Sequence, residues 1–182
     1  IVVVVIKKAT VYSLVAVSMN LLNGFTGLFS LGQAGFMLLG AYAYGVLTIP
    51  VDKRASVYQY FDGGAIQFSL PEIFAGFLGD TVGSLVGMLL ALLVGGILAA
   101  LMAYLIGLPV LRLKSDYLAI ATLGFAEILR AFFQWNALGP ITNGANMLKS
   151  FPTFADFNIK NAAGQVVLRL STFVPFLVAI VC

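Results

Sequence analysis

The chain is dominated by long uncharged stretches separated by short polar segments. Residues 9–51 and 81–111 contain no charged side chain. Each stretch exceeds the about 20 apolar residues that an α-helix needs to cross a bilayer. Membrane-spanning β-strands would instead alternate in polarity over segments of about ten residues, a pattern that these stretches lack. The pattern therefore predicts an all-α fold, a polytopic transmembrane helical bundle.

The lengths of the two stretches predict how often each one crosses the membrane. Residues 81–111 form about 46 Å of helix, which crosses a hydrocarbon core of about 30 Å once. Residues 9–51 form about 65 Å of helix, which suffices for two crossings, or for one crossing and a broken or re-entrant segment.

Basic residues favour the second alternative for the first stretch. The positive-inside rule places Lys7, Lys8, Arg112 and Lys114, which flank the two stretches, together in the cytoplasm. This requires an odd number of crossings within the first stretch. It also places residues 52–80, with two basic and four acidic side chains, outside.

A break in the first stretch is expected where the sequence is least suited to a helix, in a glycine-rich segment near residues 23–35. Irregular backbone at membrane depth is tolerated only when it is buried in protein or lines a cavity. We therefore predict that the polar residues and glycines of this region form a helix break or part of a translocation pathway: Asn20, Asn23, Gly24, Thr26, Gly27, Ser30, Gly32, Gln33 and Gly35. Alternatively, these glycines only permit close helix packing.

Small residues also recur at four-residue spacing along residues 81–111. Such a row lets a second helix approach closely. The residues predicted to form this packing face are Gly83, Gly87, Gly95, Ala99, Ala103 and Gly107.

Two polar segments are predicted to be external loops. In residues 52–80, the S-x-x-E spacing of Ser69 and Glu72 predicts a capping box that begins a short interfacial helix. Residues 136–169 contain Gly-Pro and Asn-Gly turn signals. Three basic side chains against one acidic side chain argue mildly against an external position for this second loop.

Residues 117–135 predict a further span that contains two opposite charges. Glu127 and Arg130 are three residues apart, share one helical face, and are predicted to form a buried ion pair. The alternative is an amphipathic helix at the cytoplasmic surface with both charges in water, because burying an ion pair costs several kcal/mol.

Composition excludes several classes of protein. With 61% hydrophobic and 9% charged residues, the chain is far from the composition of soluble domains, and its net charge of +3 forms no basic stripe for nucleic acid. It has no histidine and a single cysteine, Cys182, so we expect no catalytic site, metal or cofactor. A passage for a neutral or zwitterionic solute fits the polar but uncharged break, and a purely structural bundle is the alternative.

Two long motifs resemble a known family. The pattern G-x-x-G-x-x-S-L-G-x-x-x-F-x-x-x-G-A-Y begins at Gly24 and ends at Tyr42, and R-L-x-x-x-Y-x-A-I-x-T-L runs from Arg112 to Leu123. Both are similar to motifs of the inner-membrane permease subunits of branched-chain amino acid ABC importers. The resemblance extends from residue 18 to residue 148.

The chain departs from the family pattern at several positions. Gln33 stands where the family usually has histidine, and Ser115 where it often has glycine. Asn143 and Met147 replace glycines of an external T-G-G-x-N-G motif. That external loop motif is retained at Thr142, Gly144 and Asn146. No segment matches the family's E-x-A-A-x-x-x-G loop that docks on the ATPase, which we expect beyond residue 182.

The resemblance implies a multi-pass subunit of a bacterial inner-membrane importer driven by ATP. It would form the translocation pathway for branched-chain amino acids delivered by an external substrate-binding protein. The implied partners are that protein, a second permease subunit, two ATP-binding cassette subunits that hydrolyse ATP, and the lipid bilayer. Residues 1–182 would be one transmembrane permease domain, truncated at both ends. Alternatives are a related permease for urea or short amides, or a proton-coupled secondary transporter that uses Glu127 and Arg130.

Overall fold

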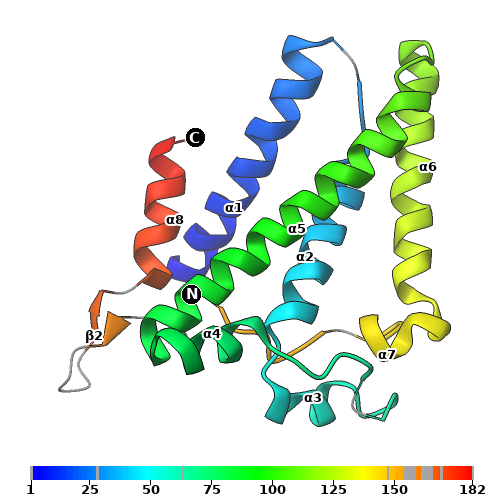
Figure 1. Ribbon diagram of the computed structural model, residues 1–182. Coiled ribbons are helices and arrows are strands. Elements are labelled where there is room, and N and C mark those ends of the chain that lie inside the picture. Colours follow the sequence, from blue (N-terminus) through cyan, green and yellow to red (C-terminus); the bar gives the residue numbers. More distant parts are fainter. Residues whose placement is uncertain are drawn as a thin grey trace. The chain divides into compact units, whose positions relative to one another are not determined.

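The computed structural model describes most of the chain, and the described residues are mainly helical, which confirms the predicted class. The chain divides into two compact units, Ile1–Ser30 with Thr153–Cys182, and Leu31–Pro152 (Figure 1). The residues described are 2–27, 29–62, 64–146, 148–153, 159–160, 166–168 and 170–181.

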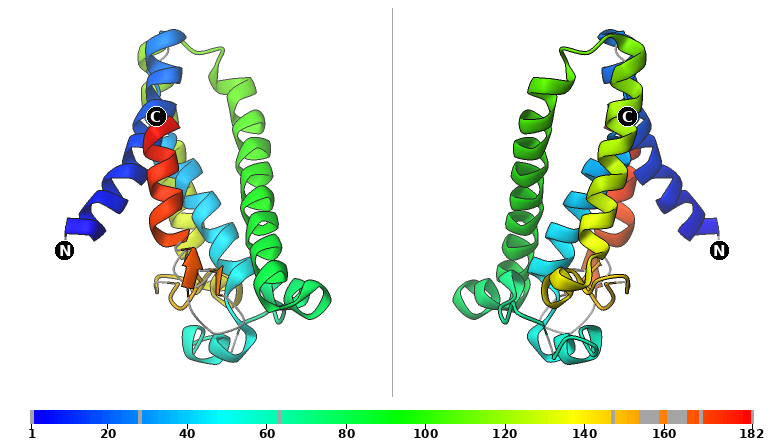
Figure 2. Two further views of the ribbon diagram at one scale, coloured as in Figure 1. Left: turned by 90° about the vertical axis from the view of Figure 1, so that its left-hand side faces the viewer. Right: turned by 90° about the vertical axis from the view of Figure 1, so that its right-hand side faces the viewer.

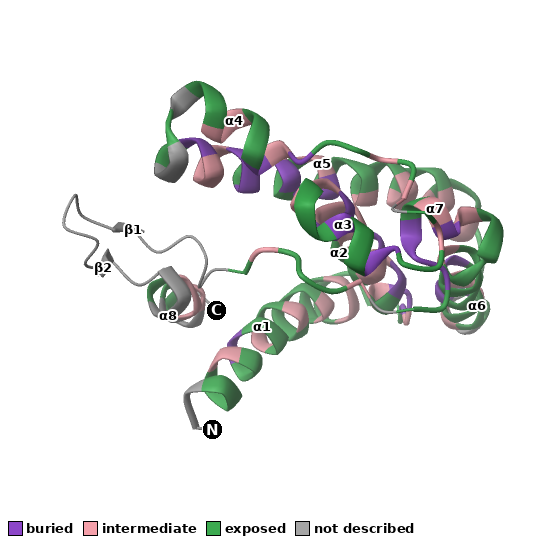
Figure 3. Ribbon diagram, turned by 90° about the horizontal axis from the view of Figure 1, so that it is seen from below, coloured by how far each residue is buried: buried purple, intermediate pink, exposed green. Residues whose placement is uncertain are grey.

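The first unit contains α1 (Val2–Asn20), which continues as a π-helical turn (Leu21–Phe25), and α8 (Leu170–Val181). α1 and α8 pack against each other, and the short strands β1 (Ile159–Lys160) and β2 (Val166–Leu168) pair antiparallel. Most described residues of α1 are exposed within the unit, and the ribbon of this helix is mainly green in Figure 3, where green marks exposed residues. An apolar helix this exposed needs lipid or further protein around it.

The second unit is built around α2 (Gln33–Thr48), which packs against both α5 (Asp80–Val110) and α6 (Ser115–Gln134). A short connection joins α5 to α6 at one end, and Figure 2 shows α5 rising to this connection and α6 returning from it. The small helices of the unit are α3 (Val51–Val57), α4 (Leu70–Leu78), a 3₁₀ turn (Asn136–Leu138) and α7 (Gly139–Thr142).

Among the described residues, three helical segments are long and apolar enough to cross a membrane: Val4–Phe25, Val82–Val110 and Tyr117–Gln134. The second and third match spans predicted from the sequence, whereas the first begins before residue 9 and includes Lys7 and Lys8. α2 has 16 residues and is about 24 Å long, which is shorter than the hydrocarbon core of about 30 Å.

One end of the second unit is covered by α3, α4 and α7, and we call it the capped end (Figure 1). Here the segments predicted as two separate external loops contact each other. The Tyr58 hydroxyl donates to the carbonyl of Ile141 at 2.8 Å, and the N–H of Ala65 donates to the carbonyl of Pro140 at 2.7 Å. The connection between α5 and α6, which carries residues 112–114, lies at the opposite end. The contacting parts of the two loops therefore lie at the same end of this unit.

Local structure differs from the sequence prediction at two places in the capped end. α4 begins at Leu70 after the N-cap residue Ser69, but the capping box does not form. The Ser69 hydroxyl donates to the carbonyl of Thr48 instead, and the Glu72 carboxylate accepts the N–H of Val51 at 3.3 Å. The two side chains of the expected box thus tie α4 to the end of α2 and to the start of α3, a helix that the sequence analysis did not anticipate.

Candidate functional site

The chain between α1 and α2 contains the segment predicted as a helix break. α1 widens into the π-helical turn, which ends at Phe25, and the hydroxyl of the next residue, Thr26, donates to the carbonyl of Leu22. Gly27 has a φ of +66°, a left-handed conformation that glycine adopts without steric cost. The Asn23 side-chain oxygen accepts the N–H of Ser30 at 3.2 Å, so a side chain satisfies a backbone group that no helix satisfies.

Asn20 and Gly24 lie one turn apart at the end of the first unit's long helix. A β-carbon on Gly24 would come within 2.5 Å of the Asn20 side-chain oxygen. The glycine thus leaves room for the Asn20 amide against the helix.

The second unit fixes the other end of the break against α6. The N–H of Leu31 donates to the Thr122 hydroxyl at 3.0 Å, and a β-carbon on Gly32 would lie 3.3 Å from Thr122 Cβ. One turn later, a β-carbon on Gly35 would lie 3.0 Å from Ala126 Cα. Gln33 begins α2 between these contacts and is half-buried. α2 therefore starts alongside α6 through close backbone contact, and the Thr122 side chain accepts a hydrogen bond from the irregular backbone at Leu31, before α2 begins.

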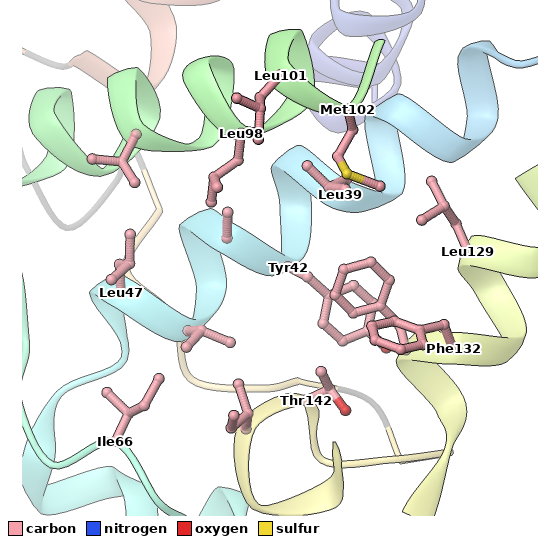
Figure 4. A pocket seen from close by; sticks show the side chains of 15 residues that line it. Leu39, Tyr42, Leu47, Ile66, Leu98, Leu101, Met102, Leu129, Phe132 and Thr142 are labelled. Atoms are coloured by element: carbon pink, nitrogen blue, oxygen red, sulfur yellow. The ribbon is translucent and has the colours of Figure 1, made fainter. Parts of the chain in front are cut away.

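A cavity of about 420 Å³ lies between α2, α5 and α6 (Figure 4). Ile66 and α7 lie at its capped end. Among the described residues that line it, none is charged, and only Tyr42 and Thr142 carry a polar side-chain atom. The lining residues are Leu39, Tyr42, Ala43, Val46, Leu47, Ile66, Val94, Leu98, Leu101, Met102, Leu129, Phe132, Phe133, Ile141 and Thr142.

Aromatic rings form one wall of this cavity. Tyr42 of α2 stacks on Phe133 of α6 with ring centroids 4.7 Å apart and an interplanar angle of 16°. Phe132 meets Phe133 edge-on at 6.1 Å. Aromatic pairs of this kind add stability beyond the area that they bury. These contacts therefore hold the rings of the wall in fixed positions.

Few of the residues predicted to be functional from the sequence line this cavity. Of the predicted pathway residues in this unit, Gly32, Gln33 and Gly35 do not line it, whereas Thr142 of the external loop motif does. The α2 side of the lining was not predicted because its residues are almost all apolar. The sequence pattern that could have identified this side is an apolar stripe at helical spacing: Leu39, Tyr42, Ala43, Val46 and Leu47.

Arg54 holds the capped end together from inside. Its side chain is 3% exposed and donates to the carbonyls of Val46 at 2.8 Å, Phe68 at 2.7 Å and Ile66. Burial lowers the pKa of the Arg54 guanidinium below its ordinary value and raises the pKa of the neighbouring Tyr58 phenol. One buried cation thus connects the end of α2 with residues 66–68. This role could not be predicted from the sequence, in which Arg54 is one arginine within a polar loop.

The external loop motif forms the tight turn that ends α7. Asn143 and Gly144 have φ values of 63° and 58°, both left-handed. This explains why the family pattern has two glycines here and why asparagine, the next most tolerant residue, can replace the first. Thr142 donates to the carbonyl of Leu138 at 3.1 Å and accepts the N–H of Gly144 at 3.4 Å, while Asn146 is exposed on the following turn.

The predicted packing face of α5 contacts different partners along its length. A β-carbon on Gly83 would clash with the backbone of Phe74, and one on Gly87 would lie 2.6 Å from Pro71 Cα, so both glycines pack on α4. Further along, a β-carbon on Gly95 would lie 3.3 Å from the carbonyl oxygen of Gly40 in α2. Ala99 and Ala103 are half-buried, and a β-carbon on Gly107 would contact only Leu111 of the same segment.

Glu127 and Arg130 lie on a face of α6 that does not line the cavity. Their carboxylate and guanidinium groups are 3.7 Å apart, and the side chains are 66% and 61% exposed. α6 instead buries Leu118, Ala126 and Leu129. The described part of this chain therefore does not bury the pair, whose burial in an assembled protein remains a prediction.

Comparison with known proteins gives consistent matches. A family profile described as "Branched-chain amino acid transport system / permease component" matches residues 1–182. The chain is 31% identical over 142 residues to the high-affinity branched-chain amino acid transport system permease protein LivM of Escherichia coli (strain K12), and equally to that of Salmonella typhimurium (strain LT2). Each match covers 78% of this chain and 25% of the relative, so the chain spans about a quarter of the length of these relatives. No solved structure matches the chain significantly.

Proposed function

This chain belongs to the family of permease components of branched-chain amino acid transport systems, and from that membership we propose that it is a membrane-spanning subunit of an ATP-driven importer. It forms part of the translocation pathway for branched-chain amino acids. The protein is a multi-pass protein of the bacterial inner membrane, as its apolar helices suggest.

The apolar cavity between α2, α5 and α6 is the observation that carries this proposal. Its volume of about 420 Å³ falls within the range of small-molecule sites, and its wall of leucine, valine and aromatic side chains suits an aliphatic side chain. The Thr142 hydroxyl already donates to the carbonyl of Leu138 and accepts the N–H of Gly144. The cavity therefore offers an apolar surface for the side chain, and the charged head of the amino acid needs groups outside it.

The partners follow from the same membership. A second permease subunit completes the pathway, two ATP-binding cassette subunits hydrolyse ATP, and an external binding protein delivers the amino acid. The chain itself needs no catalytic site. Its capped end, where the two predicted external loops meet, faces the binding protein.

The cavity weighs against the two alternative solutes and mechanisms. Urea and short amides are almost entirely polar, and transferring them into an apolar cavity without hydrogen-bond partners costs several kcal/mol. Glu127 and Arg130, which a proton-coupled transporter would use, do not line the cavity and lie on another face of α6.

Reconstitution of the full-length permease with its partners in proteoliposomes tests the proposal. We expect uptake of L-leucine that depends on ATP and is inhibited by isoleucine and valine, but not by urea or acetamide. Leu98→Trp, which fills the cavity, should reduce uptake about tenfold. The matched change Leu93→Trp, at an exposed position of α5 outside the cavity, should leave it unchanged. Uptake driven by a proton gradient without ATP, or saturable urea uptake, would overturn the proposal.

Orientation is tested separately by labelling single cysteines with a membrane-impermeant thiol reagent. In a background from which Cys182 and any other native cysteine have been removed, Ser56→Cys at the capped end should react in spheroplasts. Ser115→Cys, at the start of α6 beside Lys114, should react only after the membrane is opened. The reverse labelling would invert the proposed topology.

A further inference from the structure

A second cavity of about 350 Å³ opens at the capped end, between α3 and the segment that follows α7. In contrast to the apolar cavity, its lining is largely polar. The polar side chains that line it are Ser56, Gln59, Tyr60, Asn143, Asn146 and Lys149. We call it the outer pocket.

The charge of the outer pocket is positive. Among the described residues that line it, Lys149 is the one charged side chain, and no carboxylate is present. Asp52 and Lys53 of the adjacent α3 do not line it. Of the other polar groups, the Ser56 hydroxyl already donates to the carbonyl of Lys53 at 2.7 Å. The amides of Gln59 and Asn146 and the hydroxyl of Tyr60 are further groups of the lining that can donate hydrogen bonds. A pocket with one ammonium group and several neutral donors is suited to a small carboxylate.

Neighbouring residues separate the outer pocket from the apolar cavity. Thr142 lines the apolar cavity and Asn143 lines the outer pocket, and these two residues are 3% and 2% exposed. The turn at the end of α7 is therefore a thin partition, with an apolar space on one side and a cationic, polar space on the other. An amphipathic solute with a charged head and an aliphatic tail matches this pair of environments.

The turn that separates the two cavities is firmly held. The N–H of Asn143 donates to the carbonyl of Gly139 at 2.9 Å, and the N–H of Asn146 donates to the carbonyl of Asn143 at 3.1 Å. On the α3 side, Tyr58 is 1% exposed and its hydroxyl anchors Ile141. A site whose backbone is ordered before binding loses less entropy when the ligand arrives.

We propose that the outer pocket is a binding site for the α-carboxylate of an aliphatic amino acid, with Lys149 as its cationic partner. The inference rests on the proposed function and adds a site to it, where the amino acid is held by its carboxylate before its side chain enters the apolar cavity.

Binding to the full-length permease, purified in detergent without the external binding protein, tests the site directly. The probes are L-leucine, 4-methylpentanoate, which keeps the carboxylate but lacks the amine, and 3-methylbutylamine, which lacks the carboxylate. We expect titration calorimetry to detect the first two and not the third. Lys149→Met should weaken L-leucine binding about tenfold, as expected for the loss of one charge-assisted hydrogen bond, and Lys149→Arg should restore most of it.

Matched variants keep the result specific. Lys53→Met removes an exposed lysine of α3 outside the pocket and should bind L-leucine as the wild type does. Asn146→Asp adds a negative charge to the lining and should weaken binding at least as much as Lys149→Met. Equal binding by the Lys149→Met and Lys53→Met proteins, or binding of 3-methylbutylamine as tight as that of L-leucine, would overturn the site.

Different experimental results would contradict the outer pocket and the proposed function. If the reconstituted importer shows no ATP-driven uptake of L-leucine, the proposed function is wrong. If uptake is normal and Lys149→Met leaves the KM for L-leucine unchanged, the function stands and the outer pocket is overturned.

Discussion

Gly35 of α2 lies directly against the backbone of Ala126 of α6. A β-carbon on Gly35 would be 3.0 Å from Ala126 Cα and 3.2 Å from Ala126 Cβ. Such distances are too short for ordinary packing, so the two helices approach as closely as their backbones allow. This contact holds α2 beside α6, where together they form the aromatic wall of the apolar cavity.

The Gly35→Ala substitution should destabilise the permease even though it adds only one methyl group. α2 and α6 would have to separate, and overpacking of this kind costs about 1–3 kcal/mol. Gly40→Ala is the matched control in the same helix, because its β-carbon would meet nothing within 4 Å. The thermal midpoint of the purified protein should fall for the first variant and stay level or rise for the second. Equal midpoints would contradict a backbone contact at Gly35.

Gly87→Ala should separate α4 from α5 in a similar way. Its β-carbon would lie 2.6 Å from Pro71 Cα, an atom that cannot move without shifting α4. Gly96→Ala, on the same helix but with nothing within 4 Å, is the control. We expect a loss of about 1–3 kcal/mol for the first change only, together with faster protease cleavage near residues 70–78. Unchanged cleavage would show that α4 does not depend on this contact.

Much of the fold could be predicted from the sequence because membrane spans have a simple physical signature. Length and the absence of charge located α5, and an apolar stretch with one pair of opposite charges located α6. Glycine spacing located the interruption before α2. The helices that pack on the small residues could not be predicted. A GxxxG pair indicates that another helix approaches closely, but the pattern does not specify which helix this is. Gly83 and Gly87 accordingly pack on α4, a helix of nine residues, and not on another span.

The candidate site was less predictable because its two cavities depend on tertiary contacts. Tyr42 and Phe133 stack although 91 residues separate them, and neither carries an unusual local pattern. Glu72 satisfies the S-x-x-E pattern but accepts the N–H of Val51 from another helix. The folded chain places the start of α3 beside the Glu72 carboxylate, which the local pattern cannot predict. Only Thr142 of the predicted external motif lines the apolar cavity.

Arg54→Met should loosen the capped end. Three backbone carbonyls, those of Val46, Ile66 and Phe68, would lose their donor, and each buried acceptor left unpaired costs about 1–3 kcal/mol. Lys53→Met, an adjacent exposed cation, is the control and should be nearly neutral. Thermal unfolding and protease cleavage within residues 58–69 provide the measurements. Arg54→Lys should recover little, because one ammonium group does not reproduce the guanidinium fork.

The last prediction concerns the ion pair on α6, whose two side chains are more than half exposed within this chain. Because α6 is apolar and long enough to span the membrane, we predict that another membrane segment or the second permease subunit covers this face in the assembled importer. Glu127→Gln or Arg130→Met would then leave a buried charge unpaired and cost about 3–5 kcal/mol, while the double variant would recover much of that loss.

Thermal stability and ATP-driven L-leucine uptake of the assembled complex distinguish this prediction from its alternatives. A structural pair predicts unstable single variants and a double variant that is both more stable and active. Single variants as stable as the wild type would instead place the pair in water, where exposed ion pairs contribute at most about 1 kcal/mol. A stable double variant without transport would assign Glu127 and Arg130 to the transport step itself, since their loss would then affect the movement of solute and not the fold.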